Sequence, residues 1–140
     1  RGPIDVSSWL QPLPEDGSVP PLPGWRWIPT PGHTVGHVAF WREADRALIA
    51  GDAFITTDQE SAYAVATQKP ELQGPPMYFT PDWASAKQSV RTLADLNPTL
   101  AVTGHGPAIQ GQQLSDGLRA LADRFDEIAV PDQGRYVPGA

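Results

Sequence analysis

Proline and glycine are the feature of this sequence that most limits what it can fold into. Of its 140 residues, 16 are proline and 13 are glycine, and six of the prolines fall within residues 1–24. Proline fixes φ and removes a backbone donor, so it interrupts helices and central strands. We therefore expect an irregular, extended segment over 1–24, one domain of short elements over 25–130, and a tail over 131–140.

Composition excludes several classes of function. An apolar fraction of 40 % with 19 % charged residues is typical of a globular domain. The net charge of −6 is opposite to what a protein that neutralises phosphates needs, so we expect no nucleic-acid partner. Cysteine is absent, which excludes disulfides, thiolate metal sites and a cysteine nucleophile. No run approaches the ~18 apolar residues of a membrane span, so we expect no membrane partner.

From its start, we expect this sequence to be a piece of a longer protein. It begins with Arg1-Gly2-Pro3, and its single methionine is Met77. We expect an N-terminal part to be missing and the intact protein to be cytoplasmic.

Four short segments have the character of β-strands. They are residues 25–28, 37–41, 47–50 and 100–103, and the polar stretch 42–46 is typical of a hairpin turn between two of them. Residues 52–80 show no sustained period, and a loop of that length in a small domain is usually functional or mobile.

Two amphipathic helices are predicted in the last third of the chain. The first is expected to have Thr80 as its N-cap and Pro81 as its first residue. Its apolar positions follow at helical spacing: Trp83, Ala86, Val90, Leu93 and Ala94. The second is predicted as one continuous helix with another such face: Leu114, Leu118, Leu121, Phe125 and Ile128. Strands alternating with helices favour layered α/β packing, with both helices on one side of a sheet.

Three polar side chains each stand just beyond a predicted strand. His33 lies in a glycine-rich turn, Asp52 follows residues 47–51, and His105 follows residues 100–103 between two glycines. We expect them to converge at one sheet edge, where imidazole and carboxylate groups suit zinc and similar divalent ions. Taken singly, each has a simpler interpretation as a hydrogen-bonding turn residue. His37 opens an apolar strand and is predicted to pack or to support a ligand rather than to bind metal itself.

The order of three short motifs resembles a known family. Residues 30–37 are TPGHTVGH, residues 48–52 are LIAGD, and residues 103–106 are TGHG. Together they resemble the second half of a metallo-β-lactamase-fold hydrolase, with a first motif similar to that of glyoxalase II. The resemblance runs from about residue 24 to the end of the second helix. It implies an α/β fold, namely the C-terminal half of an αββα sandwich.

The resemblance also implies a site with two metal ions, zinc first and iron or manganese as alternatives. His33 would complete a three-histidine site, Asp52 would bridge the two ions and act in catalysis, and His105 would bind the second ion. His37 is not a ligand in the family, and we expect it at most to support the ligands from behind. Such ions lower the pKa of a bridging water and polarise the bond under attack.

One departure from the family is that its H-x-H-x-D-H motif is absent, since no histidine precedes His33. Each ion would then have two protein ligands, whereas catalytic zinc takes three. We therefore expect this chain alone to be inactive. In the intact protein we expect metal-dependent hydrolysis of a small ester, thioester, lactone or similar bond. The alternative is a non-catalytic, metal-free interaction module derived from the same fold.

Half a sandwich would leave an apolar sheet face uncovered. We expect Trp27, Phe40 and Trp41 on that face, covered by the missing N-terminal half or by another copy of the chain. The loop over 53–80 is the candidate substrate wall, through Tyr63, Met77, Tyr78 and Phe79. An equally weighted interpretation is that its aromatic side chains pack against the core.

Overall fold

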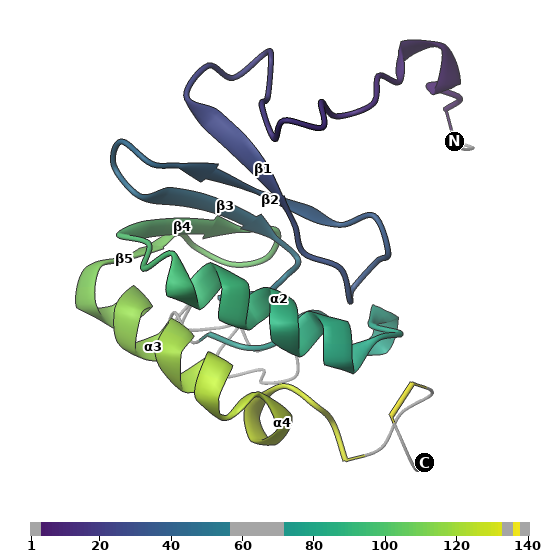
Figure 1. Cartoon of the computed structure of the whole chain (residues 1–140). Helices are drawn as coiled ribbons and strands as arrows, with labels where there is room; N and C mark the ends of the chain where they lie inside the picture. The colour runs from purple at the N-terminus through teal and green to yellow at the C-terminus, as the bar shows by residue number, and fades with distance from the viewer. Residues whose placement is uncertain (1–3, 57–71, 133–135, 138–140) are drawn as a thin grey trace.

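A five-stranded mixed sheet organises the computed structural model, which describes residues 4–56, 72–132 and 136–137 (Figure 1). Its strands are β1 (Trp25–Pro29), β2 (Val38–Arg42), β3 (Ala47–Gly51), β4 (Leu100–Thr103) and β5 (Ile109–Gln110), and they are adjacent in that order. Strands β3 and β4 pair in parallel, and the other pairs are antiparallel. A parallel pair needs a crossover connection, and the segment between β3 and β4 provides it with a helix.

The helices lie on one side of this sheet. They are α2 (Trp83–Asp95), α3 (Gly111–Asp123) and the short α4 (Phe125–Ile128), with 3₁₀ turns η1 (Ser7–Trp9) and η2 (Met77–Phe79). Figure 1 shows α2 and α3 side by side against the same face of the sheet, which confirms the layered α/β prediction. Within the described residues, no helix combines the length and the apolar character needed to cross a bilayer.

The core forms between the helices and the near face of the sheet. From the strands it receives Ala39, Trp41, Leu48, Ala50 and Ala101, and from the helices Val90, Leu93, Leu114, Leu118 and Leu121. All ten are 1 % exposed or less. Burying a leucine or valine side chain stabilises a fold by roughly 1.5–3 kcal/mol, so these residues hold the two layers together.

The far face of the sheet is less buried. Phe40, Ile49 and Trp27 are partly exposed there, and 43 % of Val102 is exposed. Trp27 lies opposite Phe40 in the β1–β2 register, and its Nε1 donates to the Pro14 carbonyl at 2.8 Å. Among the described residues, Pro14 of the N-terminal segment contacts this face at the β1 edge of the sheet.

The prediction that Trp41 lies on the uncovered face is wrong. Trp41 is 1 % exposed, packs in the helix-side core and pairs with Leu48. Neighbouring residues of a strand point to opposite faces, so Phe40 and Trp41 do not share one. The indole Nε1 of Trp41 donates to the Glu43 carboxylate at 2.8 Å, which satisfies its polar atom.

Helix boundaries also differ from the sequence-based expectation. The N-cap of α2 is Asp82, whose carboxylate accepts the Ser85 N–H at 2.9 Å, so neither Thr80 nor Pro81 has its expected role. The second predicted helix is divided into α3 and α4 at Arg124, whose φ of −117° and ψ of 32° are not helical. Strand β5 is too short for its pattern to be detected in the sequence.

Candidate metal centre

Three turns at one edge of the sheet carry the predicted site residues. His33 lies in the β1–β2 connection, Asp52 directly follows β3, and His105 lies just after β4. Because β3 and β4 are parallel neighbours, their C-terminal ends meet at the same edge. The structure therefore brings together all three residues, although 53 positions separate Asp52 from His105 in the sequence (105 − 52).

Asp52 stands between the two imidazoles, with one carboxylate oxygen toward each. His33 Nε2 lies 3.5 Å from Asp52 Oδ2, and His105 Nε2 lies 3.6 Å from Asp52 Oδ1. Both separations exceed the usual range of a direct hydrogen bond. The side chain of His33 is 14 % exposed and that of His105 is 46 % exposed, so His105 forms the open side of the cluster.

Gly104 provides the space that the Asp52 carboxylate occupies. A Cβ built on Gly104 would lie closer than 3.0 Å to Asp52 Oδ1, so any larger residue would displace that oxygen. Within the described part of the chain, Oδ1 is buried and has no hydrogen-bond partner. Burying a carboxylate oxygen without a partner costs free energy of folding. A cation bound beside Oδ1 would offset that cost.

The turn that carries His33 rests on helix α2. Gly32 has a φ of +135°, and its Cβ would lie 2.5 Å from backbone atoms of Ala86. The Asp82 N–H donates to the Gly32 carbonyl at 3.3 Å, and Ser89 Oγ donates to the Pro31 carbonyl at 2.7 Å. Only glycine permits this approach, which places His33 over the start of α2.

Three threonines support the histidines, and sequence analysis did not assign them this role. Thr80 Oγ1 lies 3.3 Å from His33 Nδ1 and donates to the Pro76 carbonyl. Thr56 and Thr103 both donate to the His105 carbonyl, at 3.1 and 2.7 Å. Thr56 lies 49 positions before His105, so no local spacing in the sequence could have identified the contact.

His37 lies behind the cluster and contacts the Asp52 backbone. Its Nε2 accepts the Asp52 N–H at 3.0 Å, and its Nδ1 lies 2.8 Å from Thr30 Oγ1. Burial lowers the pKa of His37, and the neighbouring His33 lowers it further. The ring is therefore held in its neutral form at neutral pH.

The donor atoms form two pairs, and the spacing within each pair fits one divalent metal ion. No group of three or more His, Asp or Glu side chains within residues 4–56, 72–132 and 136–137 surrounds a single metal position. Instead, Asp52 is shared between one pair with His33 and another with His105. Two ligand atoms on one tetrahedral zinc ion lie about 3.4 Å apart, given bonds of about 2.0–2.2 Å. The two observed separations match that value.

The candidate substrate wall divides into three parts. Tyr63 lies outside the described residues, within 57–71. Met77 packs against the core, whereas Tyr78 is 73 % exposed and Phe79 is 71 % exposed. These two residues of η2 directly precede Thr80, which contacts His33.

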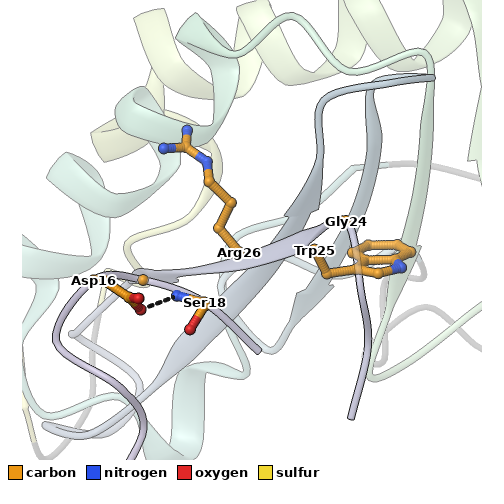
Figure 2. A pocket seen from close by; sticks show the side chains of 6 residues that line it. Asp16, Ser18, Gly24, Trp25 and Arg26 are labelled. Carbon is orange, nitrogen blue, oxygen red and sulfur yellow. Dashed lines mark hydrogen bonds between the residues drawn. The ribbon is translucent and has the colours of Figure 1, made fainter. Parts of the chain in front are cut away.

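A separate hollow of about 290 Å³ lies where the N-terminal segment crosses β1 (Figure 2). It is lined by Asp16, Gly17, Ser18, Gly24, Trp25 and Arg26. The Asp16 carboxylate accepts the Ser18 N–H at 2.8 Å, and hydrogen bonds from Ser18 lower the pKa of Asp16. Figure 2 shows the Arg26 side chain extending away from Asp16. The hollow shares no residue with the His–Asp cluster.

Comparisons with known proteins find a similar sequence and similar solved structures. YflN of Bacillus subtilis (strain 168), a probable metallo-hydrolase, is 51 % identical over 128 residues, which cover 91 % of this chain and 48 % of YflN. A crystal structure of the metallo-beta-lactamase family protein TTHA1429 from Thermus thermophilus is 26 % identical, with a TM-score of 0.49, over 73 % of this chain and 30 % of that one. TTHA1623, solved in a di-iron-bound form, is 23 % identical, with a TM-score of 0.49, over 92 % of this chain and 50 % of that one.

The chain thus spans about half the length of YflN. Its residues 1–105 match the family profile of the metallo-beta-lactamase superfamily, which is more than half of the chain. The chain therefore belongs to the metallo-beta-lactamase superfamily.

Proposed function

We propose that this chain is the C-terminal half of a metal-dependent hydrolase. The observation that carries the proposal is the position of Asp52, whose two carboxylate oxygens face the Nε2 atoms of His33 and His105 at 3.5 and 3.6 Å. A carboxylate with one imidazole on each oxygen suits a bridge between two metal ions. Its buried, unpaired Oδ1 supports the same interpretation.

Each residue of the cluster has a defined part in this proposal. His33 and Asp52 would hold one ion, and His105 and Asp52 would hold the other. Zinc is the first choice, and iron or manganese would suit the same nitrogen and oxygen donors. When bound, such ions lower the pKa of a coordinated water and polarise the bond under attack. The protein contributes by holding the Asp52 carboxylate in the space that Gly104 leaves open.

The remaining ligands would come from outside this chain. Catalytic zinc takes three protein ligands, and each pair here supplies two. The relative YflN is about twice as long as the matched region, which leaves room for a further half-domain. We propose that a preceding half-domain, or another copy of this chain, completes the site and covers the far face of the sheet around Val102.

The substrate would be a small molecule with an ester, thioester, lactone or similar bond. The net charge of −6 opposes binding of a long polyanion such as nucleic acid. Tyr78 and Phe79 expose aromatic surface close to the contact between Thr80 and His33, so they are the described residues best placed to line a substrate site.

The test measures metal content and turnover of a generic thioester in the full-length protein that carries this chain. Asp52→Ala should reduce metal content and turnover at least as much as His33→Ala or His105→Ala does, because Asp52 would be a ligand of both ions. Each loss should exceed the ~10–100-fold change typical of residues that only support a ligand. Asp123→Ala, at an exposed position of α3, is the matched control and should leave both unchanged.

The 140-residue chain should show little or no turnover when zinc is added, because each ion would have only two protein ligands where catalytic zinc takes three. If the chain alone binds two zinc ions tightly and is fully active, the incomplete-site proposal fails. If the full-length protein binds no metal and turns over no substrate, the metal-free interaction module replaces the hydrolase.

A further inference from the structure

His37 makes two hydrogen bonds that together determine where its proton lies. The Asp52 backbone N–H is an obligatory donor and points at His37 Nε2, 3.0 Å away, so Nε2 must present a lone pair. A neutral imidazole carries its proton on the other nitrogen. That nitrogen, Nδ1, lies 2.8 Å from Thr30 Oγ1 and therefore donates to it.

The residue before Asp52 is shaped for this contact. Gly51 has a φ of +55°, and a Cβ there would lie 2.7 Å from His37 Nε2. Any side chain at this position would push the ring off the Asp52 amide. The Gly51 carbonyl also accepts the Gly104 N–H at 2.8 Å, which joins the ends of β3 and β4 directly beneath the carboxylate.

His37 also closes the turn that carries His33. The Thr30 N–H donates to the His37 carbonyl at 2.9 Å, so Thr30 and His37 are joined by both backbone and side chain. Thr30 is 1 % exposed, which makes it a fixed anchor for the ring. A single imidazole therefore connects the His33 turn to the backbone of Asp52.

We propose that His37 is a positioning residue for the metal centre: its neutral Nδ1–H ring fixes the Asp52 backbone and so aims the Asp52 carboxylate between His33 and His105. The inference rests on the proposed function for what the carboxylate holds. The hydrogen bonds that it requires join protein atoms only and can be tested separately.

The first measurement is the tautomer of His37 in the ¹⁵N-labelled full-length protein, prepared without metal. Two-bond ¹H–¹⁵N correlation spectra at neutral pH should show Nδ1 protonated and Nε2 unprotonated, with the signal assigned by its loss in His37→Gln. A His37 ring with its proton on Nε2 would overturn the inference, because that nitrogen could not accept the Asp52 N–H.

A pair of amide variants separates the two hydrogen bonds. In His37→Gln the side-chain carbonyl can reach the position of Nε2 and accept the Asp52 N–H. In His37→Asn the shorter amide can replace Nδ1 toward Thr30 but cannot reach Asp52. We expect His37→Asn to weaken Zn²⁺ binding by ~10–100-fold, and His37→Gln to lose less than about tenfold. The Asp52 amide should exchange its hydrogen faster in His37→Asn only.

The results distinguish this inference from the proposed function. If His37→Asn binds Zn²⁺ as the wild type does and keeps the Asp52 amide protected, His37 is only a packed side chain and the inference is wrong. If the wild type itself does not bind Zn²⁺, the proposed function fails, and the tautomer and amide exchange still decide whether His37 positions Asp52. Equal weakening of Zn²⁺ binding in His37→Gln and His37→Asn would also count against it, because the rescue by an acceptor would be absent.

Discussion

The two faces of the sheet differ in what covers them, although their residues are similarly apolar. On the helix side, Leu48 and Ala101 are 1 % exposed or less. Their neighbours on the other side, Ile49 and Val102, are partly exposed, Val102 by 43 %. Strands that are apolar on both faces are typical of sheets buried between two layers. The sequence is thus suited to a second layer that the described residues do not provide.

The largest loss of stability is expected where the turn between β1 and β2 packs against helix α2. Gly32→Ala should lower the free energy of unfolding by about 3–6 kcal/mol, because the new Cβ would combine an unfavourable φ with a clash against the Ala86 backbone. Urea titration of this chain measures it. The control is Gly36→Ala in the same motif, where nothing lies within 4 Å of a Cβ and no loss is expected. Equal losses in both variants would show that the Gly32 contact with α2 is not formed.

Adjacent residues of β3 compare the two faces directly. Leu48→Ala should cost about 2–5 kcal/mol, because it leaves a cavity under α2 and α3. Ile49→Ala on the far face should cost less than half as much in this chain, since that side chain is already partly exposed. Chemical unfolding of the two variants provides the comparison. A larger loss from Ile49→Ala would reverse the assignment of the covered face.

The far face offers a test of whether a second layer exists in the longer protein. Val102→Thr keeps the side-chain volume and adds a hydroxyl, so in this chain it should change stability by about 0.5 kcal/mol or less. In the full-length protein the same change should cost about 1–3 kcal/mol if another layer buries Val102. Val90→Thr is the control, because Val90 is 0 % exposed and should be costly in both forms. No difference between the two forms for Val102→Thr would mean that this face stays uncovered.

The smallest change in stability is expected at the start of α2, the helix that packs against the His33 turn. Hydrogen bonds from the Ser85 backbone and side chain lower the pKa of Asp82, so its charged form stabilises the fold. That contribution is present above the ordinary carboxyl pKa of about 4 and is lost as pH falls through the lowered value.

Asp82→Ala should therefore lower the melting temperature slightly at pH 7, and the difference from wild type should shrink in acid. Asp82→Asn keeps a side-chain acceptor for the Ser85 N–H but has no charge, so at pH 7 its melting temperature should lie between those of Asp82→Ala and wild type. Thermal unfolding at pH 7 and pH 3 measures both variants. An unchanged difference at the two pH values would show that the charge of Asp82 does not contribute.

Much of the fold was predictable because periodicity reports burial locally. The apolar spacing of Trp83, Val90 and Leu93 predicted the buried face of α2, and the structure confirms it. Boundaries were less predictable, since the break at Arg124 interrupts a helical pattern that continues through Phe125. The two-residue period of a strand predicts that Trp41 and Phe40 lie on opposite faces of the sheet. Hydrophobicity alone placed both on the uncovered face, which is wrong for Trp41.

The candidate site was predictable in its principal residues only. His33, Asp52 and His105 stand just after strand patterns, and the ends of β3 and β4 meet because those strands are parallel neighbours. Thr56 supports His105 from 49 positions away, and nothing in the local sequence marks it. His37 was expected to support the ligands, but its contact with the Asp52 amide depends on how the β1–β2 turn folds over β3.

The sequence by itself determined the alternation of short strands and helices, the apolar faces that form the core, and the order of the three motifs. Each of these follows from local spacing and from residue chemistry, which a linear pattern records. Tertiary structure decided the position of the Asp52 carboxylate between two imidazoles, the space that Gly104 leaves for it, and the hydrogen bond from Asp52 to His37. These depend on distances between turns that lie far apart in the chain, and such distances are fixed only when the sheet pairs and α2 packs against it.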